Sequence, residues 1–262
     1  ASASLIGTGE IRSCFALLCV FPSKLSHPYN LMRTNLFSRS TSLGALRKAA
    51  MLRLVTVIAL LPGLTFWTTL PLGANPSGGI VVNGDVNIGT GAGGHLTINQ
   101  GSQNAIINWA DFSIAAGEVT EFIQPGTSSA VLNRVTGGNP SAIYGALKAN
   151  GNVFVINPNG ILVGASGTID VHGLVLSTLD VSNGEFLAGG DMLFEGANDK
   201  GIVNMGKINA IGGDVFLIGK TIQNSGTVSA TSGRVGFGAG EEVLLTAGED
   251  LSGERLFVRA TG

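Results

Sequence analysis

The chain has 262 residues, of which 40 are glycine and only 12% are charged. This composition disfavours a helix-rich fold, because a glycine in a helix interior costs about 1 kcal/mol relative to alanine. Basic residues outnumber acidic ones seven to one before position 75, and acidic residues outnumber basic ones sixteen to eight after it. The acidic remainder has no basic stripe to neutralise phosphates, which argues against nucleic acid as a partner.

A secretory signal peptide is predicted over residues 51–74. It has a basic n-region that ends at Arg53, an apolar h-region over residues 54–61 and a cleavage site after Ala74. Pro62 interrupts the apolar run, which is therefore shorter than the roughly 20 residues of a membrane-spanning helix. A membrane anchor is the alternative interpretation.

Residues 1–50 precede the signal and are rich in Ser and Arg, without periodicity. We expect them to be a disordered upstream leader or an over-extended reading frame, with Met51 as the true start. Cys14 and Cys19 lie there and are the only cysteines. Their removal would leave the predicted β-domain, residues 75–262, without disulfides and without a cysteine-based metal site.

The segment from Gly78 to Gln124 is predicted to cap the amino end of that domain. It holds short apolar runs separated by Gly, Asn and Asp clusters, which is typical of strands and turns. A cap is expected because an uncovered sheet edge invites pairing with other chains. The strand candidates are Ile80–Val86, His95–Ile98, Ala105–Trp109 and Val119–Ile123.

Turn chemistry is clearest in Asn157-Pro158-Asn159-Gly160, which has the residue types of a type I turn. Pro158 pushes the residue before it toward an extended conformation, so Val153–Ile156 should enter the turn as a strand. Ile161–Val163 should leave it as another. Neither flank alternates apolar with polar residues, which predicts strands buried on both faces, as in parallel sheets.

A 20-residue repeat begins near residue 201. Residues 202–210 recur as 222–230, and residues 213–218 recur as 233–238 at the same offset of 20. A fixed period built from short strands and Gly/Asn corners predicts successive coils of a parallel β-helix.

Stacked coils would place Asn204 directly below Asn224, where the two side chains can share hydrogen bonds. We expect left-handed backbone at these corners, which Gly206 and Gly226 would accommodate without a Cβ. The carboxyl end, residues 257–262, shows no recognisable cap, so we expect a domain that is truncated at its C-terminus.

Three carboxylates, Asp170, Asp191 and Asp214, are spaced by nearly one coil and could meet on neighbouring coils. Paired carboxylates there would suit the glycoside chemistry of β-helical polysaccharide lyases and glycosidases. The alternative is that Asp191 and Asp214, which each follow Gly-Gly, satisfy turn amides. The calcium-binding nonapeptide consensus that Gly-Gly-Asp suggests is otherwise absent.

Other candidate residues have simpler interpretations. Residues 89–94 match G-x-G-x-x-G, but the strand predicted after them replaces the helix that binds pyrophosphate. His95 and His172 lack partners at metal-ligand spacing. Trp109, Phe112 and Ile114 are expected to lie in the core rather than to form an apolar ligand patch, because they follow strand spacing. Asn108 and Asn133-Arg134 have no recognisable catalytic partner.

Three motifs, residues 108–114, 130–138 and 151–161, are similar to the amino-terminal two-partner secretion domain of filamentous haemagglutinin-type exoproteins. The resemblance covers residues 75–246 and is nearest the high-molecular-weight adhesin branch. Ser177-Thr178 and Phe186-Leu187 occupy family-like positions. The family's Asn-Pro-Asn-Gly motif maps onto Asn157 to Gly160, and Asn133 and Arg134 fall in a family motif. A second motif of some members, Asn-Pro-Asn-Leu, has no counterpart.

The resemblance implies a right-handed, single-stranded parallel β-helix with an amino-terminal β cap and extra-helical strands. It also implies export by the Sec machinery and recognition by an outer-membrane transporter with periplasmic domains and a β-barrel, without catalysis, metal or cofactor. Asn157 and Asn159 would contact the transporter or hold the turn. A self-contained adhesin module is an alternative, and a host or neighbouring-cell ligand would be bound through sequence beyond residue 262.

Overall fold

The computed structural model describes residues 75–248 and 256–259. The predicted leader, the signal segment, its cleavage site at Ala74 and both cysteines lie outside the described residues. Within these residues the regular secondary structure is almost all strand, with one short helix, α2 (Asn183–Ala188), and one 3-10 turn, η1 (Ala92–Gly94). None of the described helices has the length and apolar character needed to cross a membrane.

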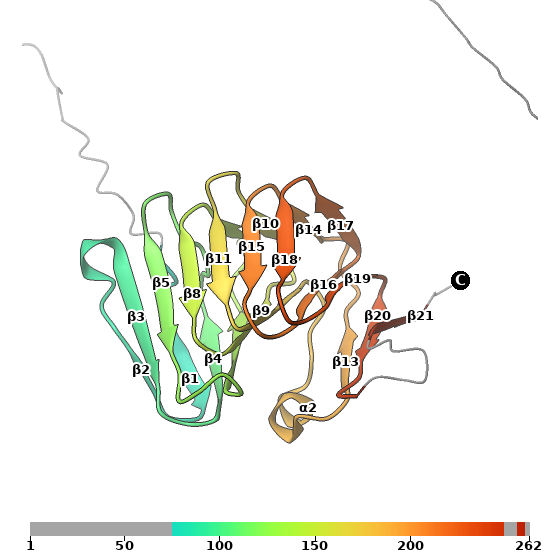
Figure 1. Ribbon diagram of the computed structural model, residues 1–262, viewed down its shortest axis with the longest axis horizontal. Helices are drawn as coiled ribbons and strands as arrows, with labels where there is room; N and C mark the ends of the chain where they lie inside the picture. Colours follow the sequence, from blue (N-terminus) through green and yellow to red (C-terminus); the bar gives the residue numbers. More distant parts are fainter. Residues whose placement is uncertain (1–74, 249–255, 260–262) are drawn as a thin grey trace, which may run out of the picture. The chain divides into compact units, whose positions relative to one another are not determined.

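Successive coils wind through three sheets, so that a complete coil gives one strand to each (Figure 1). Sheet 1 contains β1 (Ile80–Asn83), β4 (Asn104–Trp109), β6 (Ala130–Val135), β9 (Asn152–Ile156), β12 (Gly173–Ser177), β16 (Val215–Gly219) and β19 (Val235–Ala239). Sheet 2 contains β2 (Val86–Ile88), β3 (His95–Gln100), β5 (Val119–Ile123), β8 (Ala146–Ala149), β11 (Thr168–Val171), β15 (Lys207–Ala210) and β18 (Thr227–Ala230). Sheet 3 contains β7 (Ser141–Ile143), β10 (Ile161–Val163), β14 (Gly201–Asn204) and β17 (Thr221–Asn224). The predicted parallel β-helix is confirmed.

The strand register follows the predicted repeat. β14 pairs with β17, β15 with β18 and β16 with β19, in parallel and at the offset of 20. Asn204 Nδ2 donates to Asn224 Oδ1 at 2.8 Å, so the predicted asparagine stack is present. The reason given for the corner glycines was wrong, because neither has a positive φ. A Cβ on Gly206 would instead lie 2.4 Å from the carbonyl oxygen of Gly167, and one on Gly226 would lie 2.2 Å from that of Gly206.

The amino-terminal cap consists of β1 and β2, which pair antiparallel with β4 and β3. The sequence predicted a single strand over Ile80–Val86, and this was wrong, because the chain bends at Gly84-Asp85 and changes sheet there. Residues 95–100 form a strand after η1, so the glycine-rich segment precedes no long helix, as expected.

Apolar side chains stacked in register fill the interior of the coils. Along sheet 1, Ile107, Val155, Leu176 and Leu217 occupy equivalent inward positions and are fully buried. Their burial stabilises each coil against its neighbours, since fully burying one such side chain contributes about 1.5–3 kcal/mol.

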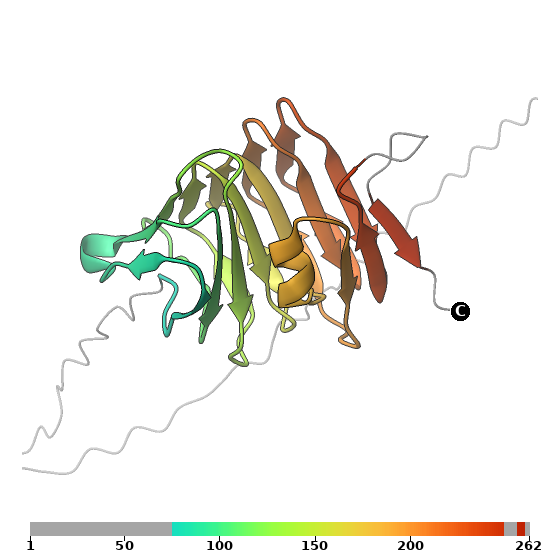
Figure 2. The ribbon, with the colours of Figure 1, turned by 90° about the horizontal axis from the view of Figure 1, so that it is seen from below.

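An extra-helical arm covers the outward face of sheet 1. Between β12 and β14 the chain leaves the coil and forms α2 and β13 (Met192–Glu195); β13 then pairs antiparallel with β20 (Glu242–Leu245), which pairs with β21 (Leu256–Arg259). The arm lies on one side of the coils (Figure 2). Phe154, Val175 and Phe216 beneath it are only 4–9% exposed. The implied extra-helical strands are confirmed, and part of the carboxyl end, which had no predicted structure, forms β21.

The strands that flank the 157–160 turn differ in burial. In β9, Val153 and Val155 pack into the interior while Phe154 and Ile156 pack under the arm, so burial on both faces is confirmed. In β10, Leu162 is only half-buried, and the same prediction was wrong there. The arm covers sheet 1, and the outward side of sheet 3 lacks such a cover among the described residues.

Candidate functional site

The 157–160 segment forms the corner between β9 and β10, where the chain passes from sheet 1 to sheet 3. The Gly160 amide donates to the Asn157 carbonyl oxygen at 3.1 Å, which closes a four-residue β-turn. Gly160 has φ +110°, a backbone conformation that is strained for any residue with a Cβ, so glycine is required there. The Asn157 amide also donates to the Ser177 carbonyl oxygen of the next coil at 2.9 Å.

The side chain of Asn157 is fully buried and ties this corner to the preceding one. Its Nδ2 donates to the Asn139 carbonyl oxygen and to Ser141 Oγ, each at 2.9 Å. Its Oδ1 accepts the backbone amide of Asn159 at 2.9 Å. Both ends of the amide are therefore satisfied within the chain, as a buried polar group requires.

Asn159 is half-buried and adds a second tie. Its Nδ2 donates to the Gly137 carbonyl oxygen at 2.8 Å and lies 3.1 Å from Asn157 Oδ1. Pro158, between the two asparagines, is exposed. The corner therefore holds its asparagines against residues 137–141 and presents its proline at the surface.

Asn133 and Arg134 are adjacent in β6 and point to opposite sides of sheet 1. Asn133 is fully buried in the inward column, where its Oδ1 accepts a hydrogen bond from Trp109 Nε1 at 2.9 Å. Its Nδ2 lies 3.2 Å from the Phe154 carbonyl oxygen. Trp109, Phe112 and Ile114 are buried as predicted, and the two aromatic rings meet edge to face with centroids 5.8 Å apart.

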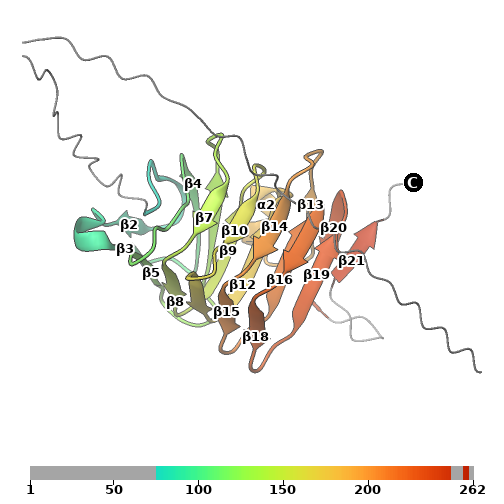
Figure 3. The ribbon, with the colours of Figure 1, turned by 90° about the horizontal axis from the view of Figure 1, so that it is seen from above.

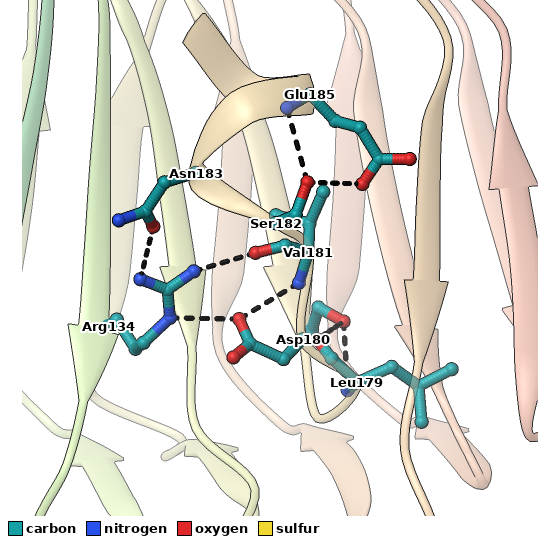
Figure 4. A network of polar contacts seen from close by, with 8 residues as sticks. Arg134, Leu179, Asp180, Val181, Ser182, Asn183 and Glu185 are labelled. Carbon is teal, nitrogen blue, oxygen red and sulfur yellow. Dashed lines mark hydrogen bonds and ion pairs between the residues drawn. The ribbon is translucent and has the colours of Figure 1, made fainter.

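Arg134 holds the start of the extra-helical arm (Figure 4). Its guanidinium donates to Asp180 Oδ1 at 2.9 Å, to the Val181 carbonyl oxygen at 2.6 Å and to Asn183 Oδ1 at 2.7 Å. Three contacts from one rigid fork fix both the position and the direction of the chain entering α2. We name this group of residues the arginine clamp.

Replacing Arg134 with alanine should loosen the arm while leaving the coils folded. Charge-assisted hydrogen bonds contribute about 1.5–3 kcal/mol each, but Asp180 is half-exposed, so we expect a net local loss of about 1–2 kcal/mol. Hydrogen exchange of residues 180–195 should accelerate roughly 5- to 30-fold. Lys148→Ala, which removes an exposed basic residue from sheet 2, is the matched control. Equal exchange in both variants would contradict the clamp.

The three carboxylates do not come together. Asp170 in β11 has Lys148 and Asn209 as its register partners, whereas Asp191 lies in the arm and accepts the Ala247 amide at 2.9 Å. Asp214 accepts the Arg234 amide at 2.8 Å. The nearly coil-like spacing was misleading because residues 178–200 belong to the arm rather than to a coil.

The histidines and the remaining acidic groups do not form a metal cluster within 75–248 and 256–259. His95 lies 3.1 Å from Glu121 on the exposed side of sheet 2. Near the 157–160 corner, Lys200 lies 2.9 Å from Asp199, and this contact lowers the pKa of the Asp199 carboxyl.

The resemblance implied extra-helical strands but not their place in the chain, and the helix α2 was missed although it had a local signal. Ser182 and Glu185 form a capping box, in which the Glu185 amide donates to Ser182 Oγ at 3.2 Å and Ser182 Oγ lies 2.7 Å from Glu185 Oε2. The register also changes there, since Leu174 pairs with Val215 at an offset of 41 instead of 20.

Together these features define a parallel β-helix with an antiparallel amino-terminal cap and an extra-helical arm, the class to which secretion domains of two-partner systems belong. The chain belongs to the family of the TPS secretion domain, whose model matches residues 73–256. This family implies a cognate outer-membrane transporter, and its exoproteins are secreted through the periplasm of Gram-negative bacteria.

Two curated relatives are heme/hemopexin-binding proteins of Haemophilus influenzae. One is 36% identical over 184 residues, which are 65% of this chain and 20% of that protein; the other is 41% identical over 100 residues, which are 38% and 11%. The match thus spans a fifth or less of these relatives. The solved HMW1 secretion domain of Haemophilus influenzae is 36% identical, with a TM-score of 0.60 over 65% of this chain and 46% of that one.

Proposed function

We propose that residues 75–248 target an exported protein to its secretion channel. The periplasmic domains of a β-barrel transporter recognise the folded coils of these residues. The observation that carries this proposal is the family match over residues 73–256. The cross-tied 157–160 corner supports it, because the motif shared with the family builds an ordered surface turn.

Export begins at the inner membrane with the Sec machinery and the signal peptide of residues 51–74, cleaved after Ala74. Cleavage removes Cys14 and Cys19 and leaves residues 75–262 without cysteine, so no disulfide within them can form a crosslink that a narrow channel would reject. Outside the cell each later coil of the exoprotein adds an interface with the previous one, and this makes passage directional.

Within the corner, Asn157 and Asn159 act first by holding the turn. Their amide nitrogens donate to Asn139, Ser141 and Gly137 in the preceding coil, so these groups are already engaged within the chain. Contact with the transporter then falls to the exposed Pro158 and to neighbouring surface residues. A host or neighbouring-cell ligand is bound by other parts of the exoprotein.

The test is secretion of the full chain from cells with and without the cognate transporter. We expect the chain in the medium to fall at least tenfold without the transporter, while processed chain accumulates in the periplasm. Ile58→Arg, within the apolar h-region, should instead stop the chain before processing even when the transporter is present. Undiminished secretion without the transporter would refute the proposal.

A further inference from the structure

The three sides of the coils differ in cover and charge. The outward side of sheet 1 lies beneath the arm, with Phe154 and Phe216 buried. The outward side of sheet 2 is exposed and carries a row of alternating charges, which includes Glu121, Lys148 and Asp170. Such a row is well solvated and needs no partner.

Sheet 3 differs from both, because its four strands contain no charged residue. Its strands β7, β10 and β14 lie side by side in Figure 3, and β17 pairs with β14 at the end of the sheet. Its outward side chains include Ala142, Leu162 and Val203, which are in register across three coils and half-buried. We call these residues, with Tyr144 and Met205, the neutral face.

The neutral face ends in two large exposed side chains. Tyr144 is 40% exposed and Met205 is 44% exposed. The Tyr144 ring is held against the backbone of Gly164, since a Cβ there would lie 2.2 Å from the ring atom Cδ1. A rigid aromatic ring beside a flexible methionine is a composition enriched at protein interfaces.

At its other end the neutral face meets the 157–160 corner, from which β10 starts. At this border Asp199 and Lys200 pair with each other at 2.9 Å and together add no net charge. An occupant must therefore offer uncharged surface, because an unpaired charge buried against this face would lose its hydration without compensation.

The size of the face restricts the occupant further. Strands of about four residues are roughly 13 Å long, and four strands at about 4.8 Å spacing span roughly 15 Å, which gives an area of about 200 Å². A stable dimer needs about 800 Å² from each partner, so the face is too small to hold a second copy by itself. It is suited to one part of a short-lived contact.

We propose that the neutral face is the surface on which an uncharged patch of the transporter's periplasmic domains docks, beside the exposed Pro158. This inference rests on the proposed function and specifies where recognition occurs. A transient, apolar contact fits a targeting domain that must be released when its chain has passed the channel. Such binding depends only weakly on salt, unlike an interface between charged surfaces.

The test measures binding of the purified full chain to the purified periplasmic domains of the transporter. Met205→Lys should weaken binding at least tenfold, and Leu162→Lys should do the same. Ile123→Lys is the matched control, because Ile123 is a 48% exposed apolar residue on sheet 2, and it should change Kd less than twofold. Raising salt from 50 to 300 mM should change the wild-type Kd less than about threefold. Urea midpoints of the variants establish that each is folded.

The outcomes separate the two proposals. If the wild-type chain fails to bind and is secreted without the transporter, the proposed function fails. If the wild type binds but Met205→Lys and Ile123→Lys bind equally well, the function stands and the neutral face is not the docking surface. Concentration-dependent self-association that Met205→Lys abolishes would also overturn the inference, because it would assign the face to a second copy.

Discussion

Replacing Asn133 with alanine is expected to lower the free energy of unfolding of the β-helix by about 3 kcal/mol. The change leaves the buried indole N–H of Trp109 without its acceptor and opens a cavity in the inward column between Ile107 and Val155. An unsatisfied buried donor costs about 1–3 kcal/mol, and the lost packing adds to it. Urea unfolding followed by circular dichroism measures the effect.

A double-mutant cycle tests whether the Trp109–Asn133 bond itself is responsible. Trp109→Phe removes the donor and leaves Asn133 Oδ1 without this hydrogen bond. Asn133→Leu removes the acceptor and leaves the indole N–H of Trp109 without it. The double variant leaves neither, and we expect its destabilisation to be at least about 1 kcal/mol smaller than the two single effects added together. Asn209→Ala, on the exposed side of sheet 2, should cost under about 0.5 kcal/mol. Strict additivity would show that Asn133 contributes only by its volume.

The fold was predictable where one coil resembles the next. The 20-residue offset predicted the pairing of β14 with β17 and the stack of Asn204 on Asn224, since a solenoid repeats its local interactions in sequence order. The family resemblance implied the cap and the extra-helical strands. The break at Gly84-Asp85 was missed although Asn83-Gly84-Asp85 is itself a turn signal between two short apolar runs.

The arm and the arginine clamp could not be derived from local pattern. β13 pairs with β20, which lies almost fifty residues further along the chain, and no short-range periodicity encodes such a pairing. Burial of Phe154 was predicted, but what covers it was not. Arg134 has partners only once the arm is in place, and the polar Asn133 gave no sign that it lies in the core.

Asn157→Ala is expected to reduce secretion more than Asn159→Ala, because the two asparagines hold the corner to different extents. Asn157 is fully buried, and its loss strands the Asn159 amide and the acceptors at Asn139 and Ser141. We expect a stability loss of about 2–3 kcal/mol for Asn157→Ala and about 1 kcal/mol for the half-buried Asn159. Pro158→Ala removes only an exposed ring and should cost less than either.

Measuring secretion and urea stability on the same three variants separates the two roles of the motif. If the corner acts by holding the turn, secretion should follow stability, and lower temperature should partly restore the asparagine variants. If the asparagines themselves are the contact, Asn159→Ala should reduce transporter binding about tenfold under conditions in which its urea curve shows that it is fully folded. The hydrogen bonds of Asn157 favour the first result, since a side chain satisfied at both ends within the chain has nothing left to offer a partner. The same bonds keep the turn in place beside the neutral face. If Asn157→Ala reduces secretion by destabilising the corner, it should therefore also weaken docking on the neutral face, which includes Leu162 and Met205.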